Sequence, residues 1–237
     1  GQAVYGIDSA PDGALYAAIR HAPTPNGVPT DVNALSSNDP AVVAIVELPN
    51  AVAVVASSFW TAKTVVESLP VIFSAPESDL EISSSKIEYE LIEGLSSDGN
   101  EVLTIGDVAL VFDESESVLT QDYFVPHLAH VPLEPVNATV RVGDSGCEIW
   151  LPTQSASYVQ RAVSEALTLE PDQVRVYPTL LGGGFGRKVD TDYAVAAAQI
   201  AQAVGETVQL IWSREEDIRK DRFRPAFSGR MSGVVDN

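Results

Sequence analysis

The segment from Leu181 to Lys188 combines more chemical features than any other part of this sequence. It reads Leu-Gly-Gly-Gly-Phe-Gly-Arg-Lys. Its four glycines let the backbone approach a ligand in conformations that a side chain would forbid. A helix expected to begin near residues 190–191 would direct free N–H groups toward an anion. Together with the charges of Arg187 and Lys188, these features predict an anion-binding or cofactor-binding loop. The alternative is a tight turn whose basic side chains are solvated.

Neither common nucleotide-binding pattern fits this loop. The dinucleotide pattern G-x-G-x-x-G fails because the sixth position, counted from Gly182, is Arg187. The P-loop pattern needs a glycine at 187 and a hydroxyl at 189, where Val189 stands. An ordinary nucleotide-phosphate site therefore remains only as a third hypothesis, which a shift of the melting temperature by ATP or NAD would support.

Metal-binding side chains are scarce in this sequence. Cys147 is the single cysteine, so the chain can form no internal disulfide, cysteine-rich zinc site or iron–sulfur cluster with its own thiolates. Among the three histidines, His127 and His130 have metal-like spacing, but no nearby cysteine completes a ligand set. We therefore expect a polar pair in a loop or at a strand end, and no metal site.

Composition narrows the class of partner. The 237 residues contain 14 Lys+Arg and 33 Asp+Glu, a formal net charge of −19. Such a balance excludes nucleic acid and anionic membrane surfaces as partners, because both require a basic face. The sequence contains no apolar run near the roughly 20 residues of a membrane span and opens with no signal-peptide pattern. The 45% hydrophobic content is enough for a buried core.

Short apolar runs between turn residues predict a small mixed α/β unit over residues 1–73. The expected strands are residues 14–19, 42–46, 52–56 and 69–73, of which 42–46 and 52–56 form a hairpin. A helix is expected over residues 58–68, and the side chains expected to pack inward are Trp60, Ala62, Thr64 and Val65. Clusters of polar and turn-forming residues over 74–116 indicate a linker with one short surface helix, residues 87–95.

The segment 117–237 is patterned more regularly. Its expected strands are residues 117–125, 138–142, 147–151, 174–177 and 207–212, and its expected helices run from Ser155 to Leu167 and from Tyr193 to Val204, where Gly205 ends the second. The last segment, 227–237, predicts a strand that ends in the turn dipeptide Asp236-Asn237 and has no partner strand. Alternating strands and helices favour an α/β unit whose loops lie at one end.

Several motifs, in order along almost the whole chain, resemble the molybdenum-binding large subunit of the xanthine oxidase family. They are residues 126–139 (PHLAHVPLEPVNAT), 150–154 (WLPTQ) and 183–188 (GGFGRK). Residues 213–219 and 222–225 are similar to its isoquinoline 1-oxidoreductase β-subunit branch in particular, and residues 1–8 and 15–19 resemble the opening of the family's hammerhead domain. The resemblance implies a hammerhead-like α/β domain at 1–73, a linker at 74–116 and the first part of the molybdopterin-binding domain at 117–237.

The resemblance also implies a cofactor, partners and a reaction. The cofactor would be molybdopterin, in bacteria its cytosine dinucleotide form, and a [2Fe–2S] small subunit would take the electrons. The reaction would hydroxylate a carbon next to nitrogen in an N-heterocycle, or an aldehyde, with oxygen from water. By position, Gln154 would hydrogen-bond to an oxo ligand of molybdenum, and Arg187 would help to neutralise the cofactor's phosphates. The backbone of the loop would line the cofactor at Gly183, Gly184, Phe185 and Gly186.

Two departures from the family pattern limit these expectations. A glutamate follows the loop lysine in purine-oxidising relatives, but Val189 stands here, so purines are not expected as substrates. The family's catalytic base, a glutamate near the end of a much longer polypeptide, has no counterpart among the 33 acids. The first residue, Gly1, and the unpaired last strand favour a piece of a larger subunit, inactive in isolation and completed by the remainder of that subunit.

Two questions stay open from sequence. The competing hypothesis from another class is a non-catalytic, acidic α/β module that docks on a protein partner and keeps the glycine loop only as a turn. A reading frame that continues beyond Asn237 into a second molybdenum-binding half would support the enzyme, and a natural stop would support the module. The compartment, bacterial cytoplasm or periplasm, is likewise open.

Overall fold

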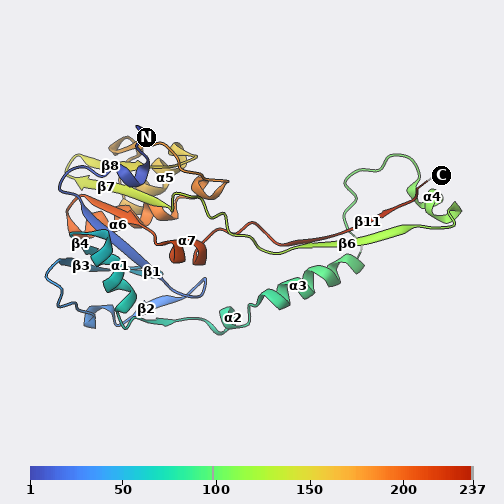
Figure 1. Ribbon diagram of the computed structural model, residues 1–237, viewed down its shortest axis with the longest axis horizontal. Helices are drawn as coiled ribbons and strands as arrows, with labels where there is room; N and C mark the ends of the chain where they lie inside the picture. Colours follow the sequence, from blue (N-terminus) through green and yellow to red (C-terminus); the bar gives the residue numbers. More distant parts are fainter. Residues whose placement is uncertain (98, 236–237) are drawn as a thin grey trace. The chain divides into compact units, whose positions relative to one another are not determined.

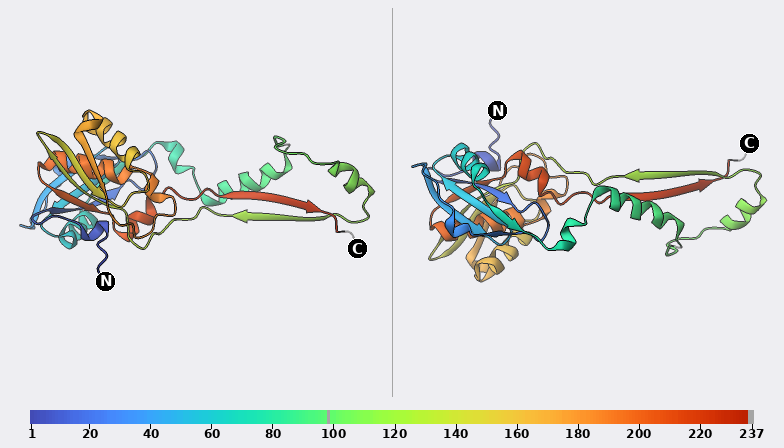
Figure 2. Two further views of the ribbon diagram at one scale, coloured as in Figure 1. Left: turned by 90° about the horizontal axis from the view of Figure 1, so that it is seen from above. Right: turned by 90° about the horizontal axis from the view of Figure 1, so that it is seen from below.

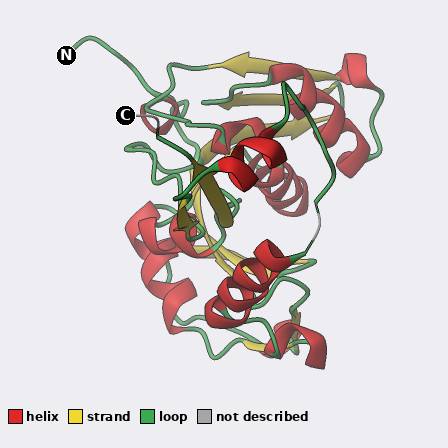
Figure 3. Ribbon diagram, turned by 90° about the vertical axis from the view of Figure 1, so that its right-hand side faces the viewer, coloured by secondary structure: helices red, strands yellow, loops and turns green. Residues whose placement is uncertain are grey.

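A computed structural model describes residues 1–97 and 99–235, and Asp236-Asn237 lie outside the described residues. The chain divides into two compact units, which are described separately below. The first contains residues 1–80 and 129–222, and the second contains residues 81–128 and the chain from Phe223 onward. Helices and strands occur in both (Figure 3), which confirms the mixed α/β fold class.

A seven-stranded mixed sheet forms the frame of the first unit (Figure 1). Its strands, in spatial order, are β3 (Val42–Leu48), β4 (Ala51–Ala56), β1 (Leu15–His21), β10 (Val208–Ile211), β7 (Asn137–Gly143), β8 (Gly146–Leu151) and β9 (Val174–Pro178). The pairs β1–β10 and β8–β9 are parallel and the others antiparallel. A separate pair joins β2 (Val28–Thr30) to β5 (Ile72–Ser74). Strands from both ends of the sequence thus share one sheet.

Strand β4 shows why this sheet is covered on both faces. All six of its residues are buried, and successive side chains point to opposite faces of a strand. Ala51, Ala53 and Val55 belong to the hydrophobic cluster under α5 (Ala156–Leu167) and α6 (Asp192–Val204). Val52, Val54 and Ala56 belong to the cluster under α1 (Phe59–Ser68). A continuous apolar run is therefore required here in place of alternation.

The helix ends follow local chemistry. The Ser58 side chain accepts a hydrogen bond from the backbone N–H of Thr61 and caps α1. Gly205 adopts φ +74° directly after α6, a conformation that glycine reaches without a steric penalty. The remaining helices of this unit are short: α2 (Glu77–Leu80) and α7 (Arg214–Arg219). None of the helices in the described ranges has the length and apolar character needed to cross a membrane.

The hairpin prediction and most strand predictions for this unit are confirmed, but one strand is displaced and some side-chain orientations were wrong. Trp60 is 73% exposed and Thr64 is also exposed, whereas Ala62 and Val66 form the buried stripe of α1. The prediction failed because spacing identifies a helical stripe without saying which stripe faces the core. The strand expected at 69–73 is displaced to Ile72–Ser74, since Leu69 ends α1 and packs inward.

The second unit is a two-stranded antiparallel ribbon of β6 (Leu119–Val125) and β11 (Phe227–Gly233) (Figure 2). The prediction that the last strand lacks a partner is therefore wrong. Register pairs Phe227 with Val125 and Gly233 with Leu119, a pairing across more than a hundred residues that sequence patterns cannot reveal. The unit also contains α3 (Ser84–Glu93), close to the predicted surface helix, and α4 (Val108–Glu114). The division at residues 73 and 116 stays a prediction.

Candidate cofactor-binding site

The predicted loop connects β9 to α6 and takes a conformation that depends on its glycines. Gly183 and Gly186 have φ values of +94° and +105°. Phe185, with φ +52°, lies in the same left-handed region although it has a side chain, and that side chain is 62% exposed. Left-handed backbone in a non-glycine residue costs free energy and clusters at functional sites. The loop therefore exposes Phe185 and Gly186 to solvent, whereas Gly184 is buried.

Gln154 lies against this loop. The Gly186 N–H donates to Oε1 of Gln154 over 3.1 Å, and the Gln154 N–H donates to the Lys188 carbonyl over 2.9 Å. A Cβ on Gly184 would come within 2.5 Å of that same Oε1. Only the oxygen of the Gln154 amide can accept the Gly186 N–H, so Nε2 is the other end of that amide, and it forms no hydrogen bond with the residues that the structure describes.

The structure thus brings together three of the predicted site residues: Gln154, Gly184 and Gly186. Gly186 was expected to line the cofactor with its backbone, but its N–H donates to Gln154. Gly183 lies on the other side of the loop, where a Cβ would meet Pro132 at 3.3 Å. Gly183 and Gly184 must therefore lack side chains so that Pro132 and Gln154 can pack against the loop.

Arg187, expected to help neutralise the cofactor's phosphates, is fully buried. Its guanidinium forms a bidentate pair with Asp192, with both N–O distances 3.0 Å. Nε lies 3.1 Å from Oδ1 of Asp221, close enough for an ion pair but not aligned for a hydrogen bond. Burial opposes the charge, but these carboxylates outweigh it and raise the pKa of Arg187. The alternative of solvated basic side chains is therefore wrong.

Lys188 is equally buried and pairs with a residue that the sequence analysis did not single out. Its Nζ lies 2.9 Å from Oε2 of Glu134, whose side chain is 5% exposed. Glu134 also accepts the backbone N–H groups of Ile7 and Gly182 and the amide of Asn137. Burial alone would raise the pKa of Glu134, but the hydrogen bond from Lys188 and those from its other donors lower it overall.

Glu134 therefore holds both ends of the glycine loop, Gly182 at its start and Lys188 at its end. It was missed because an isolated glutamate between two prolines has no spacing signature. The available signal was charge: two adjacent basic residues in an apolar, glycine-rich segment of an acidic chain need buried partners.

His130 and His127 have different surroundings. Nδ1 of His130 lies 3.1 Å from both carboxylate oxygens of Asp221, and the His130 backbone N–H also donates to that carboxylate. The ring of His127 contacts Phe223 edge-on at 6.4 Å between centroids. No cluster of three or more potential metal-ligating side chains occurs within the described ranges.

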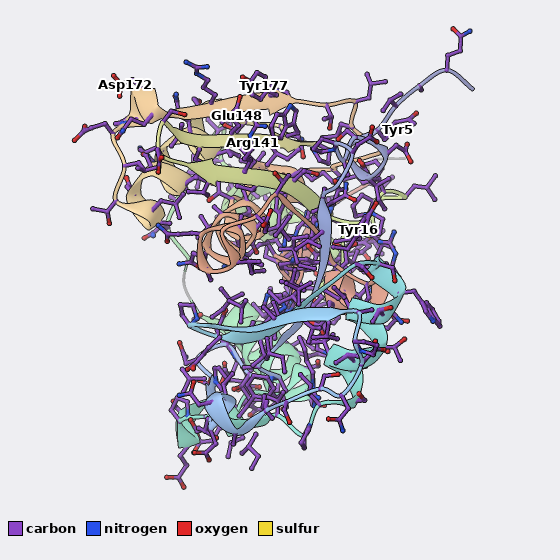
Figure 4. The ribbon with its side chains drawn as sticks, turned by 90° about the vertical axis from the view of Figure 1, so that its left-hand side faces the viewer. Tyr5, Tyr16, Arg141, Glu148, Asp172 and Tyr177 are labelled. Atoms are coloured by element: carbon purple, nitrogen blue, oxygen red, sulfur yellow. The ribbon has the colours of Figure 1, made fainter. Side chains whose placement is uncertain are left out.

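A second polar cluster lies on β7, β8 and β9 (Figure 4). Arg141 pairs with Glu148, and the Tyr177 hydroxyl donates to Glu148 over 3.1 Å. Trp150 stacks on Tyr177 with 5.2 Å between ring centroids and 13° between planes. The polar groups of this cluster pair with one another on an exposed part of the sheet. The cluster therefore stabilises the sheet and is not a second site.

A cavity of about 380 Å³ lies at the far end of α6. It is lined by the β7–β8 turn, including Gly143 and Cys147, and by residues 205–207, which follow the C-terminus of α6. The glycine loop precedes the N-terminus of the same helix. This cavity therefore has no part in the loop site.

The sequence of residues 95–237 matches the family model of the molybdopterin cofactor-binding domain. This match includes Gln154 and the entire glycine loop and covers more than half of the chain. The chain belongs to the molybdopterin cofactor-binding domain family. The predicted resemblance to the molybdenum-binding subunits of the xanthine oxidase family is confirmed.

Individual relatives are similar over nearly the whole chain. Isoquinoline 1-oxidoreductase subunit beta of Brevundimonas diminuta is 28% identical over 99% of this chain and 31% of its own length. Membrane-bound aldehyde dehydrogenase (pyrroloquinoline-quinone) of Gluconacetobacter polyoxogenes is 29% identical over 100% of this chain and 32% of its own length. The chain therefore spans about a third of these relatives.

A solved structure shares the fold. The aldehyde oxidoreductase from Desulfovibrio gigas superimposes with a TM-score of 0.70 over 97% of this chain and 30% of its own, at 18% sequence identity. At that identity the comparison establishes architecture alone.

Proposed function

We propose that this chain is the part of a molybdenum hydroxylase large subunit that holds the molybdopterin cofactor at the glycine loop. The observation that carries the proposal is the contact between Gly186 and Gln154, which fixes a side-chain amide at the edge of the loop. Family membership over residues 95–237 supports the same cofactor.

The residues at this loop fit such a group. Molybdopterin supplies a redox-active molybdenum centre whose oxo ligands accept hydrogen bonds and cannot donate them. Nε2 of Gln154 donates and forms no hydrogen bond with the residues that the structure describes, so it complements an oxo group. The backbone of Gly184 and Phe185 would line the cofactor; Gly184 is buried, and the Gln154 side-chain oxygen occupies the space that a Cβ on Gly184 would need. Gly183 contributes through its packing on Pro132.

Arg187 contributes to cofactor binding mainly by holding the loop. Its guanidinium is already shared between Asp192 and Asp221, so contact with a cofactor phosphate would need a rearrangement of that pair. Burial of both basic side chains fixes the loop conformation before any ligand arrives, and a pre-organised loop binds with a smaller entropic cost.

The substrate is an N-heterocycle or an aldehyde, the two classes that the names of the relatives state. Val189, with an exposed fraction of 38%, offers no carboxylate to a purine. Water is the source of the inserted oxygen, and electrons leave to a [2Fe–2S] small subunit, since Cys147 alone cannot ligate a cluster. The cofactor is the cytosine dinucleotide form. The base that deprotonates the attacking oxygen comes from polypeptide corresponding to the unmatched two thirds of the relatives.

Steady-state oxidation with an artificial electron acceptor tests the reaction. The complex that contains this chain should oxidise isoquinoline-like heterocycles or aldehydes, and product formed in ¹⁸O-labelled water should carry the label. Unlabelled product, or oxidation of neither class by enzyme that contains molybdenum, would contradict the proposed reaction. The chain alone should show no turnover in the same assay.

A further inference from the structure

The imidazole of His130 lies beside the glycine loop with one nitrogen unused. A Cβ on Gly186 would be 3.6 Å from Nε2 of His130. The side chain of His130 is 9% exposed, and within the described part of the chain Nε2 forms no hydrogen bond. Nε2 is not one of the fully buried unpartnered side-chain atoms of the described residues, so a ligand or water can reach it.

Asp221 fixes the orientation of the His130 ring through Nδ1, the ring nitrogen opposite Nε2. Both carboxylate oxygens of Asp221 lie 3.1 Å from Nδ1, and Asp221 in turn pairs with Arg187 of the loop itself. An imidazole whose Nδ1 donates to a carboxylate directs Nε2 outward, where it donates a hydrogen bond once the ring is protonated.

The backbone around His130 is also shaped to face the loop. Val131, the next residue, has φ +42°, a strained value for a β-branched side chain. Pro132 then approaches Gly183, whose Cβ position lies 3.3 Å from the proline side chain. Residues 130–132 therefore pack along the loop, and His130 brings Nε2 to it, an atom without a hydrogen bond to the described residues.

We propose that His130 is a cofactor-binding residue that donates from Nε2 to an anionic oxygen of the group held at the glycine loop. The inference rests on the proposed function, because it takes that group to be molybdopterin. Arg187 and Lys188 have carboxylate partners, so a hydrogen bond from His130 reaches the ligand without breaking either pair. Asp221 is its positioning residue.

The test compares the loading of two His130 variants in the assembled complex. His130→Asn keeps a donor near the position of Nδ1, and hence the contact with Asp221, but lacks Nε2; His130→Gln restores an amide donor farther out. His127→Asn is the matched control, since His127 is an exposed histidine whose ring packs on Phe223 of its own unit. Pterin and molybdenum are quantified separately, and the melting temperature of the cofactor-free protein is recorded.

We expect His130→Asn to lower cofactor content by about tenfold or more, His130→Gln to recover part of it, and His127→Asn to match the wild type. Loss of pterin together with molybdenum would assign the contact to a phosphate, and loss of molybdenum alone would assign it to a metal oxo group. Full loading of His130→Asn would overturn the inference. So would loss in both His130 variants accompanied by a large fall in melting temperature, because the role would then be structural. Wild-type complex without pterin or molybdenum would instead overturn the proposed function.

Discussion

The backbone N–H of Gly186 donates to the side-chain oxygen of Gln154 over 3.1 Å, although 32 residues separate them. Gln154 follows β8 and Gly186 precedes α6, so the contact joins two loops that leave the same sheet. It determines which end of the Gln154 amide faces solvent. A side chain that is exposed and yet oriented by a backbone donor is suited to recognise a ligand.

Replacement of Gln154 by alanine should separate activity from stability. One preorganised donor at a reacting centre typically contributes roughly 10²–10³ in kcat, whereas loss of an exposed side chain changes the free energy of unfolding by only about 0.5 kcal/mol. Turnover of metal-loaded Gln154→Ala enzyme and its thermal unfolding are the measurements. Gln202→Ala, an exposed glutamine on α6, is the control and should leave both unchanged. Normal turnover by loaded Gln154→Ala enzyme would remove Gln154 from the site.

The buried pair of Glu134 and Lys188 should show strong thermodynamic coupling. Glu134→Gln leaves the Lys188 ammonium buried without a charge partner and should cost about 3 kcal/mol or more. Lys188→Met should cost less, because Glu134 keeps three other donors. The double variant should therefore be destabilised by at least about 1 kcal/mol less than the sum of the two single-variant losses in unfolding free energy. Urea unfolding of the four proteins gives this coupling energy.

The less buried pair of Lys63 and Glu67, 2.9 Å apart on α1 with side chains 23% and 52% exposed, provides the comparison. A cycle of Lys63→Met and Glu67→Gln should give less than about 0.5 kcal/mol of coupling, since solvent screens the pair. Equal coupling energies in the two cycles would show that burial does not strengthen the pair at the loop.

Two glycines of the loop should respond differently to alanine. In Gly182→Ala the new Cβ would lie 2.5 Å from the Cβ of buried Glu134, which cannot move freely, so unfolding should become easier by about 2 kcal/mol. In Gly184→Ala the clash is with the flexible end of Gln154; stability should change by less than about 1 kcal/mol, and cofactor-dependent activity should fall instead. Gly94, with no atom within 4 Å of its Cβ position, is the control for both. The reverse order of stability effects would contradict this geometry.

Cys147 should be chemically silent in the folded protein. The thiol is 1% exposed, and burial, with a smaller contribution from Glu148, raises its pKa to about 11. Since the thiolate is the reactive form, reaction with a disulfide reagent at pH 8 should be at least ~100-fold slower than for an ordinary exposed thiol. Ser145→Cys combined with Cys147→Ala moves the thiol to an exposed position in the same hairpin and should restore reactivity. Rapid labelling of native wild-type protein would contradict the buried placement.

Much of the fold was predictable because local patterns determine it. The β7–β8 hairpin around Gly143 and Gly146, and the end of α6 at Gly205, follow from turn and cap chemistry that short segments carry by themselves. The pairing of β11 with β6 could not be predicted, because register across more than a hundred residues depends on tertiary contacts.

The candidate site also has parts that the sequence predicted and parts that it could not. The glycine loop and Gln154 have recognisable motifs, and the structure brings them together. Asp192, the bidentate partner of Arg187, lies only five residues away, but the other two carboxylates that pair with the loop's cations, Glu134 and Asp221, lie in separate segments and have no shared spacing. Sequence alone therefore predicted a basic loop that binds an anion, whereas folding buries both charges.

The molybdenum and pterin content of the purified complex tests the central claim most directly. We predict about one molybdenum and one pterin per copy of this chain in wild-type complex made by cells that synthesise the cofactor, and a marked loss of both in Gly182→Ala, where the loop is displaced. Wild-type complex that is folded and complete but contains neither molybdenum nor pterin would contradict the claim that the glycine loop and Gln154 form a cofactor site.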